Sequence, residues 1–280
     1  MSGIRVWVDG ALVDAAAPAV SAVDHGVTVG DGAFETAKID GGVPFAMTRH
    51  LRRLDRTMAG LGLPPADHDL VREGVEAVLT GEPIDFGRLR VTVTGGRGPL
   101  GSDRLDSALT TIVTAVPHPR PEPGGAVVTV PWVRNERAAT AGLKTTSYAD
   151  NVIALARAKE QGAVEALFAN TRGELCEATG SNVFVVTDGV VRTPPLDSGC
   201  LAGITRELVL EWCAREDLEV REEALPLDVL GRADEVFLTS SIKDVHPVSA
   251  VDGRALPLPG PVSTRVREVW DRYVEKGMDP

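Results

Sequence analysis

The chain has 280 residues, of which 43% are hydrophobic and 25% are charged, enough to bury the core of one large domain or two small ones. Its formal net charge of -11 disfavours binding to nucleic-acid backbones or anionic membranes, because both need a basic surface. The three cysteines, Cys176, Cys200 and Cys213, form no CxxC motif, and no apolar run suits a signal peptide or a membrane span. We therefore expect a cytoplasmic protein with no nucleic-acid or membrane partner.

The first part of the chain, residues 1–116, predicts an α+β domain. Short β-prone runs between Gly-rich turns indicate strands at Ile4–Val8, Phe34–Ile39, Arg88–Thr94 and Leu109–Val116. Apolar residues at helical spacing predict two helices, one capped by Thr48 and ending near Gly60, the other over Asp67–Leu79. Strands that bracket a pair of helices are typical of an α+β domain.

Residues 117–125, Pro-His-Pro-Arg-Pro-Glu-Pro-Gly-Gly, predict a linker, because proline cannot donate to a strand ladder and glycine favours turns. Residues 126–280 then predict a larger, mostly β domain with helices packed outside. Its expected strands are Ala126–Pro131, Glu165–Ala169, Asn182–Val186 and Glu235–Leu238. Its expected helices run from a Ser147/Asp150 capping box to Lys159, over Ile204–Ala214 and over Thr264–Val274.

The remaining motifs disfavour three kinds of site. Gly96–Gly101 matches the GxGxxG pattern, but a strand follows it instead of the long helix that a dinucleotide-binding fold requires. The five histidines show no metal-ligand spacing, so no metal site is predicted. Scattered Ser, His and Asp residues do not indicate a hydrolytic triad, because triad members meet in space and not in sequence.

Lys144 is a candidate for Schiff-base chemistry. It stands alone in the low-charge segment Gly142–Tyr148, just before a predicted helix. Such a lysine must be partly buried, because burial lowers the pKa of the amine and frees it for attack. Glu177 follows among small residues before an apolar strand, where a carboxylate could hold the proton on a pyridine nitrogen. Taken singly, each residue is more commonly a solvated surface residue.

Two segments could bind a phosphate group. Ala202–Thr205 opens a helix whose N–H groups and dipole favour an anion, and Thr239–Ser241 offers hydroxyls after an apolar strand. Arg49, in the first turn of its helix, could supply the matching cation. Hydroxyl-rich helix starts usually only cap the helix, so each of these signals is weak alone.

Together these segments resemble the class IV aminotransferases, the fold-type IV enzymes that use pyridoxal 5′-phosphate (PLP). The resemblance runs from His25 to about Val248 in one order and spacing. It is carried by His25–Glu35 (HGVTVGDGAFE), Thr48–Leu51 (TRHL), Leu143–Lys144, Cys176–Phe184 (CEATGSNVF), Leu201–Arg206 (LAGITR) and Ser240–Ser241. It implies a small α+β domain joined to a larger, mostly β domain with PLP between them, and a homodimer.

The resemblance also implies a role for each matching residue. Lys144 would form the aldimine with PLP, Glu177 would pair with the pyridine nitrogen, and Leu201 would pack against the ring. The phosphate would be bound by Arg49, Ile204, Thr205, Ser240 and Ser241. Tyr148 resembles the tyrosine that bonds the cofactor phenolate oxygen in branched-chain aminotransferases, although it stands one residue closer to the lysine.

The substrate-binding positions depart from each known relative. D-amino-acid aminotransferases bind the substrate carboxylate with an arginine and a histidine where this chain has Leu100 and Ser102, and Arg97 is the candidate replacement. Phe34 is expected to line the substrate pocket. Two residues later, Thr36 stands where branched-chain enzymes have glycine and 4-amino-4-deoxychorismate lyases have threonine. Those lyases usually carry a second threonine, at the position that Glu35 takes here.

We therefore expect a PLP-dependent aminotransferase that moves an amino group between an amino acid and a 2-oxo acid, with D-amino acids and (R)-amines among the candidate donors. The alternative is a 4-amino-4-deoxychorismate lyase, which releases 4-aminobenzoate and pyruvate, and in which Thr36 would act in proton transfer. A catalytically idle binding protein on the same fold is disfavoured by the presence of both Lys144 and Glu177.

Overall fold

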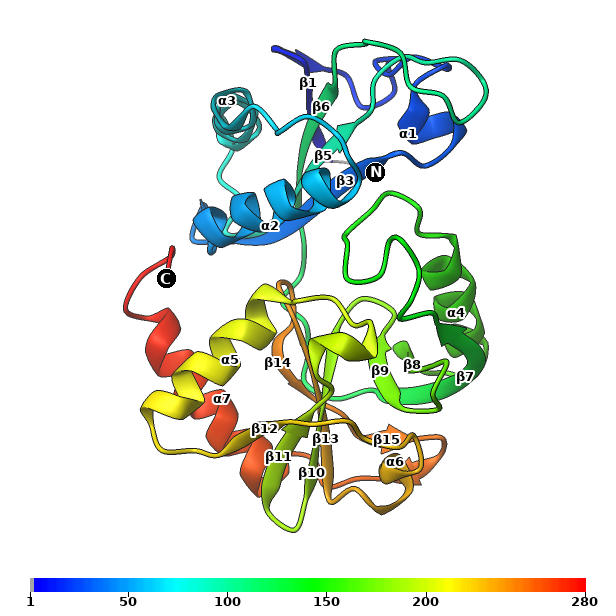
Figure 1. Cartoon of the computed structure of the whole chain (residues 1–280). Helices are drawn as coiled ribbons and strands as arrows, with labels where there is room; N and C mark the ends of the chain where they lie inside the picture. Colours follow the sequence, from blue (N-terminus) through cyan, green and yellow to red (C-terminus); the bar gives the residue numbers. More distant parts are fainter. Residues whose placement is uncertain (1–2) are drawn as a thin grey trace. The chain divides into compact units, whose positions relative to one another are not determined.

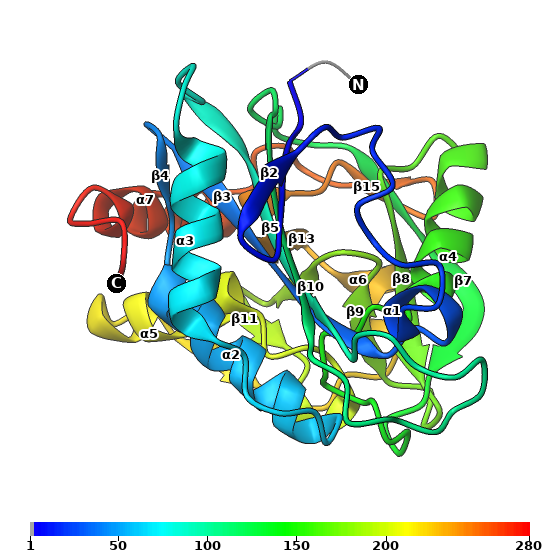
Figure 2. The same cartoon turned by 90° about the horizontal axis from the view of Figure 1, so that it is seen from above.

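A six-stranded antiparallel sheet forms the centre of the first of two units in the computed structural model, which describes residues 3–280. The strands follow the order β2-β1-β6-β5-β3-β4. They are β1 Arg5–Val8, β2 Ala11–Val13, β3 Gly32–Asp40, β4 Val43–Pro44, β5 Phe86–Thr94 and β6 Thr110–Pro117. The helices α2 (Met47–Gly60) and α3 (His68–Leu79) lie on the same side of this sheet, and the short α1 (His25–Thr28) precedes β3 (Figures 1 and 2).

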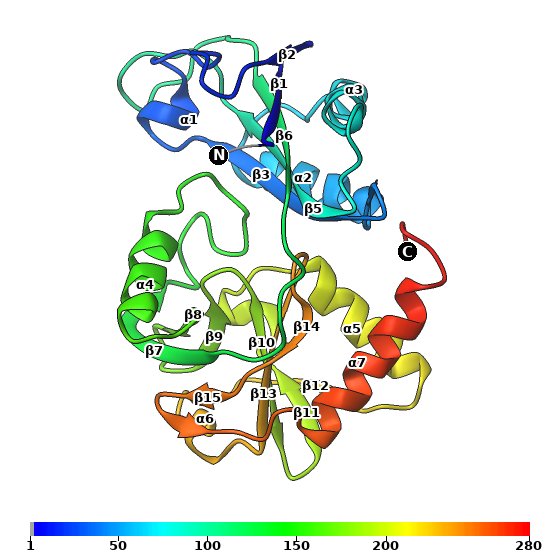
Figure 3. The same cartoon turned by 180° about the vertical axis from the view of Figure 1, so that it is seen from behind.

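Strand alternation decides which residues of β3 face these helices. Ala33 and Ala37 are buried in the core that they share with Leu54 of α2. Successive side chains of a strand point to opposite faces, so Phe34 and Thr36 belong to the face that the helices do not cover. Figure 3, the view from behind, has β3 and β5 in front of α2.

Two five-stranded sheets form the centre of the second unit, in the orders β12-β11-β10-β13-β14 and β16-β15-β7-β8-β9. Their strands are β7 Ala126–Arg134, β8 Glu165–Asn170, β9 Leu175–Ala178, β10 Asn182–Thr187, β11 Val190–Thr193, β12 Val220–Glu222, β13 Glu235–Ser240, β14 Asp244–Pro247, β15 Ala250–Val251 and β16 Arg254–Ala255. Leu167 and Leu175 of one sheet share a core with Val183 and Leu238 of the other. The inner faces of the two sheets therefore pack together.

Helices cover the outer faces of the second unit. The helix α4 (Ala149–Glu160) packs its alanines against β7 and β8. The helices α5 (Ile204–Arg215) and α7 (Pro261–Val274) lie side by side, with the rings of Trp212 and Trp270 4.9 Å apart (Figure 1). The remaining elements are α6 (Val229–Arg232) and the 3-10 helix Leu196–Ser198. The predicted α+β class is confirmed. None of the helices in residues 3–280 is both long and apolar enough to cross a bilayer.

The predicted capping of α2 by Thr48 is wrong. The helix begins at Met47, and its N-cap is Ala46, which has a left-handed backbone (φ 56°) and no capping side chain. Thr48 lies within the first turn, where its N–H and its hydroxyl donate to the Asp279 carboxylate at 2.9 and 2.5 Å. A carboxylate remote in sequence thus satisfies the helix start.

The predicted Ser147/Asp150 capping box of α4 is also wrong. Tyr148 is the N-cap, and the helix has no capping side chain. The hydroxyl of Ser147 instead donates to the main-chain oxygen of Gly30 at 3.0 Å. The segment before α4 is therefore held by its packing in the first unit and not by its own helix.

The chain passes between the two units more often than the predicted linker at 117–125 implies. The first unit runs to Arg120 and also includes Leu143–Ser147 and Met278–Pro280. The second unit comprises Pro121–Gly142 and Tyr148–Gly277. The predicted second domain, 126–280, thus includes two short segments that belong to the first unit, which they join through hydrogen bonds to β3 and to the start of α2.

Candidate active site

Lys144 is held against the edge of β3 in the first unit. Its carbonyl oxygen accepts a hydrogen bond from the N–H of Phe34 at 3.0 Å, and the N–H of Thr146 donates to Gly32 at 2.8 Å. Its own N–H donates to the hydroxyl of the buried Thr57 in α2 at 3.3 Å. These bonds add the lysine segment to the sheet like a short extra strand and leave the side chain half-buried.

Lys144 and Arg90 both lie close to the ring of Phe34. The Lys144 Nζ lies 4.3 Å from the ring centroid, and the guanidinium carbon of Arg90 lies 3.8 Å from it. Arg90 of β5 is paired with Thr36 of β3, and Thr36 lies on the same face of β3 as Phe34. All four residues, Lys144 included, therefore lie around one face of the sheet. Arg90 is a residue that the sequence reasoning missed. Arg90 is identified by the register of β3 with β5, which the alternating sequence pattern does not fix.

A buried charged cluster lies on the other face of β3. Glu35 accepts hydrogen bonds from Arg53 at 2.7 and 2.6 Å and is 2.7 Å from the Nδ1 of His50. Burial by itself raises the pKa of Glu35, but the charge and hydrogen bonds of Arg53, with the hydrogen bond of His50, hold that pKa far below its ordinary value. Burial lowers the pKa of His50 and Glu35 raises it, and with the charges of Arg53 and Lys144 also lowering it, the pKa lies below its ordinary value.

Two arginines follow each other on one side of α2, at the i and i+4 positions. Arg49, in the first turn, donates through Nε to the main-chain oxygen of Pro280 at 2.9 Å. Arg53 is one turn further on and Thr57 one turn beyond that, so along the helix axis Arg53 is about 6 Å from Thr57 and Arg49 about 12 Å. Because Lys144 is bonded to Thr57, Arg53 is the nearer of the two cations to Lys144 along the helix.

Glu177 lies within β9 in the second unit, and β10, the apolar strand predicted after it, begins at Asn182. Its Oε1 accepts a hydrogen bond from the Nε of Arg134 at 3.1 Å, and its Oε2 accepts one from the N–H of Leu201 at 3.0 Å. Glu177 and Leu201, separate in sequence, are thus in direct contact. Arg134, which the sequence reasoning missed, is held in turn over the ring of Phe168, 4.1 Å from its centroid.

The start of α5 is fixed by Asn182. Its Nδ2 donates to the carbonyl of Leu201 at 2.8 Å. A Cβ at Gly203, the N-cap of α5, would lie 2.0 Å from the Asn182 Oδ1, so only glycine allows this approach. The N-terminus of α5, with Ile204 and Thr205, has no side-chain capping hydrogen bond, and a helix start of this kind favours an anion.

The predicted hydroxyl segment lies next to this helix start. Asn182 of β10 is paired with Thr239 of β13, and Ser240 and Ser241 follow directly. The Thr239 hydroxyl is buried and has no hydrogen-bond partner among residues 3–280. A buried hydroxyl without a partner indicates a place for a polar ligand atom. The structure thus brings together both predicted phosphate segments of the second unit.

Tyr148 and Arg97, the other predicted site residues, lie on other elements than the predicted phosphate segments. Tyr148 is the N-cap of α4 and is half-buried. Arg97 is exposed in the loop after β5, where its main chain forms a bridge with Asp24.

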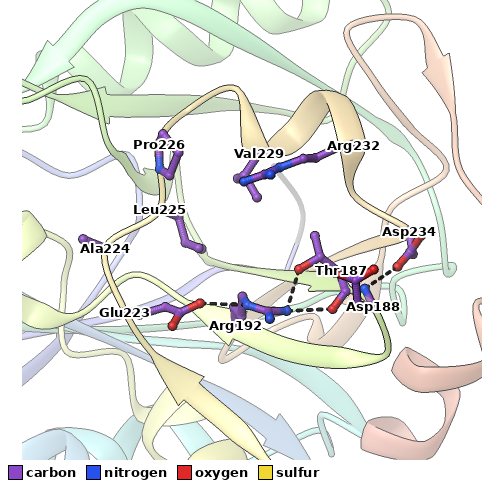
Figure 4. Close-up of a pocket in the computed structure, with 10 residues that line it drawn as sticks. All are labelled: Thr187, Asp188, Arg192, Glu223, Ala224, Leu225, Pro226, Val229, Arg232 and Asp234. Carbon is purple, nitrogen blue, oxygen red and sulfur yellow. Dashed lines mark hydrogen bonds and ion pairs between the residues drawn. The ribbon is translucent and has the colours of Figure 1, made fainter.

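A depression of about 470 Å³ in the second unit contains none of the predicted site residues (Figure 4). One of its two arginines, Arg192, is paired with Glu223 at 2.7 Å and donates to the main-chain oxygen of Thr187 at 2.7 Å. The opposed charges of its lining give it no selectivity for an anion.

Known proteins similar to this chain include several aminotransferases. The sequence profile of the family described as amino-transferase class IV matches residues 32–251. The chain is 32% identical to a D-alanine aminotransferase of Bacillus licheniformis over 277 residues, which cover 94% of this chain and 95% of that protein. Among solved structures, it is similar to the branched-chain aminotransferase of Thermoproteus uzoniensis with norvaline, with TM-score 0.87, 27% identity, and 97% and 94% of the two chains covered.

A second similar structure is the PLP-bound form of a hypothetical aminotransferase from Mycobacterium tuberculosis, with TM-score 0.86, 28% identity, and 98% and 100% of the two chains covered. The matched region includes the Lys144 segment, Glu177 and the two predicted phosphate segments, Ala202–Thr205 and Thr239–Ser241. The resemblance seen in the sequence motifs is therefore confirmed, and the chain belongs to the class IV aminotransferase family with its fold-type IV architecture.

Proposed function

We propose that the chain is a PLP-dependent aminotransferase that moves an amino group between an amino acid and a 2-oxo acid. The position of Lys144 carries this proposal. Its half-buried amine lies 4.3 Å from the Phe34 ring centroid, on the same face as the Arg90 guanidinium. An amine in partial burial suits attack on a carbonyl, and a nearby arginine suits a substrate carboxylate. The similarity to a D-alanine and a branched-chain aminotransferase supports amino acids as donors.

The described residues suit PLP. Lys144 would hold it covalently, Glu177 would face the pyridine nitrogen, Leu201 would pack against the ring, and Tyr148 would bond the phenolate oxygen. The buried Thr239 hydroxyl without a partner and the uncapped start of α5 support a phosphate site there. The phosphate ligands of the second unit would be Ile204, Thr205, Ser240 and Ser241, with the Thr239 hydroxyl added to those predicted from the sequence.

Arg49 and Arg53 are the candidate cations for the phosphate. Arg49 is the residue that the sequence motifs indicate. Arg53 is supported by its position one turn from Thr57, the residue that binds the main chain of Lys144. We favour Arg53 and keep Arg49 as the alternative.

In the mechanism, bound PLP supplies an electron sink that makes the substrate Cα proton acidic. The amine of Lys144 would take that proton from Cα. Glu177, held by hydrogen bonds from Arg134 and Leu201, would keep a proton on the pyridine nitrogen. Phe34 and Thr36 line the substrate side of the sheet. Arg90 is our candidate for holding the substrate carboxylate, with Arg97 as the loop alternative.

The lyase remains a second candidate because of Thr36. Its half-buried hydroxyl lies on the same face as Phe34, where it could help move a proton during pyruvate elimination. In an aminotransferase, Thr36→Gly changes substrate preference and leaves the rate of amino transfer nearly intact. In a lyase, Thr36→Gly selectively loses 4-aminobenzoate release, by about a hundredfold. Assay of wild type and variant with aminodeoxychorismate separates the two.

The proposed function is tested by loading the protein with PLP. We expect a visible-edge absorbance band that borohydride removes, absent in Lys144→Ala and present in a matched Lys159→Ala control. A panel of L- and D-amino acids and (R)-amines should convert the bound cofactor to its amine form. A reducible band that persists in Lys144→Ala would place the cofactor on another lysine and overturn the assignment.

We also propose a homodimer in a reducing, cytoplasmic setting. The family resemblance supports the dimer, and light scattering of the purified protein tests it. The three cysteines, Cys176, Cys200 and Cys213, are free and buried, which supports a compartment without disulfide formation. A monomer in light scattering would overturn the dimer.

A further inference from the structure

A single buried carboxylate in the second unit accepts hydrogen bonds from two segments that are distant in sequence, the turn at 179–181 and the hairpin at 240–243. Glu165, the first residue of β8, is 4% exposed. Its Oε2 accepts hydrogen bonds from the N–H of Gly180 at 2.8 Å and the hydroxyl of Thr179 at 3.1 Å. Its Oε1 accepts bonds from the hydroxyl of Ser181 at 2.6 Å and from the Nζ of Lys243 at 2.5 Å. Four donors from two distant segments therefore meet on one side chain.

Lys243 anchors the hairpin that carries the serines. It lies in the turn between β13 and β14, two residues after Ser241. Its N–H donates to the Ser240 hydroxyl at 3.3 Å, and its ammonium reaches down to Glu165. The Lys243 side chain is only 25% exposed. Its aliphatic part is therefore mostly buried and points towards Glu165 and not into solvent.

The other three donors fix the opposite segment. Thr179, Gly180 and Ser181 form the turn between Glu177 and Asn182, and Asn182 in turn holds Leu201 at the start of α5. The turn at 179–181 and the hairpin at 240–243 thus share one anchor. Burial by itself raises the pKa of Glu165, but the charge and hydrogen bond of Lys243, with the bonds from the turn, keep that pKa below its ordinary value.

We propose that Lys243, through its ion pair with Glu165, is a positioning residue that fixes Ser240 and Ser241 for binding the cofactor phosphate. This inference rests on the proposed PLP-dependent function and adds to it two residues that do not themselves contact the cofactor. Removing the ammonium frees the hairpin from its anchor, so the phosphate loses hydrogen bonds while the attachment at Lys144 is untouched.

The test compares PLP with pyridoxal, which lacks the phosphate, in titrations of apoenzyme followed by absorbance. Lys243→Met keeps the stem and removes the charge. We expect it to weaken PLP binding by about tenfold or more, the value of one or two hydrogen bonds to a charged group, and to leave pyridoxal binding within about twofold. Lys243→Arg keeps the charge and should restore most of the PLP affinity. Lys159→Met, an exposed lysine on α4, is the matched control and should change neither affinity.

A purely structural role for the pair predicts a different result. Lys243→Met would then lower the midpoint of thermal unfolding and weaken both ligands equally or neither, which overturns the proposal. If Lys243→Met fails to fold because Glu165 is left without its cation, the double variant Glu165→Gln with Lys243→Met removes both charges. The double variant should fold and still lose the preference for PLP over pyridoxal, and a normal preference would equally overturn the proposal.

Failure of the proposed function gives a separate signature. Wild-type protein would then show no borohydride-sensitive band with PLP or with pyridoxal. If wild type shows the band and Lys243→Met keeps the wild-type preference for PLP, the proposed function stands and the positioning role alone is wrong.

Discussion

Glu177 accepts hydrogen bonds from Arg134 and Leu201, and these contacts determine what its substitution tests. Glu177→Gln keeps the shape and can still accept a bond from the N–H of Leu201, but it loses the charge that would hold a proton on the pyridine nitrogen. We expect the rate of the amino-acid half-reaction to fall by about a hundredfold or more, with PLP still bound. Single-turnover absorbance measures the rate, and a rate near that of wild type would contradict the assignment.

Arg49 and Arg53 can be separated by a pair of variants. Arg53→Ala would leave Glu35 buried without its cation and would lower the free energy of unfolding by about 3–5 kcal/mol. Arg53→Lys keeps the charge and is therefore the variant to test. If Arg53 binds the phosphate, Arg53→Lys weakens PLP binding and Arg49→Ala does not. If Arg49 binds it, Arg49→Ala loses about 1.5–3 kcal/mol, one to two decades of affinity. Equilibrium titration of the apoenzyme decides, with pyridoxal as the control ligand.

The residues found only in the structure share a physical cause. Lys144, Glu177 and the serines stand in motifs that are continuous in sequence, so their candidacy could be predicted. Arg90 and Arg134 have no motif around them. Arg90 depends on the register of β3 with β5, and Arg134 on the pairing of β7 with β8, and a period-2 pattern does not fix either register.

At the scale of elements, α2 depends on a cap that lies far away in sequence. The Asp279 carboxylate accepts hydrogen bonds from the N–H and the hydroxyl of Thr48. We expect Asp279→Ala to destabilise the protein by about 1 kcal/mol, the usual value of an N-cap, and Asp279→Asn by less. Glu275→Ala, an exposed acidic residue just after α7, serves as the control.

Thermal unfolding of these variants is the measurement, and for a chain of this size about 1 kcal/mol corresponds to roughly 2–4 °C. A double variant with Thr48→Val should lose little more than Asp279→Ala alone, because the two side chains form one interaction. Additive losses would mean that the carboxylate does not cap the helix through Thr48.

Most long elements could be predicted from the sequence, and the errors are concentrated at their ends. The strands from Glu165 and Asn182 and the helix from Ile204 begin where the pattern predicts. The sequence does not predict the short strands β9 and β11, because four residues carry too little periodicity to be distinguished from a turn. The start of α2 was misplaced because its cap comes from outside the local sequence, which a capping motif does not detect.

At the scale of the whole molecule, buried titratable groups predict acid sensitivity. The folded-state pKa values of His50 and His246 lie below the ordinary 6.5, mainly because burial disfavours the charged ring. The unfolded chain therefore takes up protons first, and stability falls as the pH drops through 6.5. Glu35 and Glu165 have folded-state pKa values below the ordinary 4.5, so their contribution is present above 4.5 and is lost as the pH falls toward those lower values.

We therefore expect the midpoint of thermal unfolding to decrease in two stages between pH 7 and pH 3. His50→Gln and His246→Gln should flatten the first stage and leave the second. An unfolding midpoint that is constant from pH 7 to pH 5 in wild type would contradict the role of the histidines.

Because residues 143–147 belong to the first unit, recombination between related genes is constrained. A gene cut at the proline-rich stretch yields a front half with β3 and a back half with Lys144, although the lysine packs on β3. Neither half carries a complete reactive face, so exchange of halves between relatives must preserve the fit of the lysine segment to the receiving strand. Recombination at that boundary should therefore succeed only between parents whose Gly32–Phe34 and Lys144–Thr146 segments are mutually compatible.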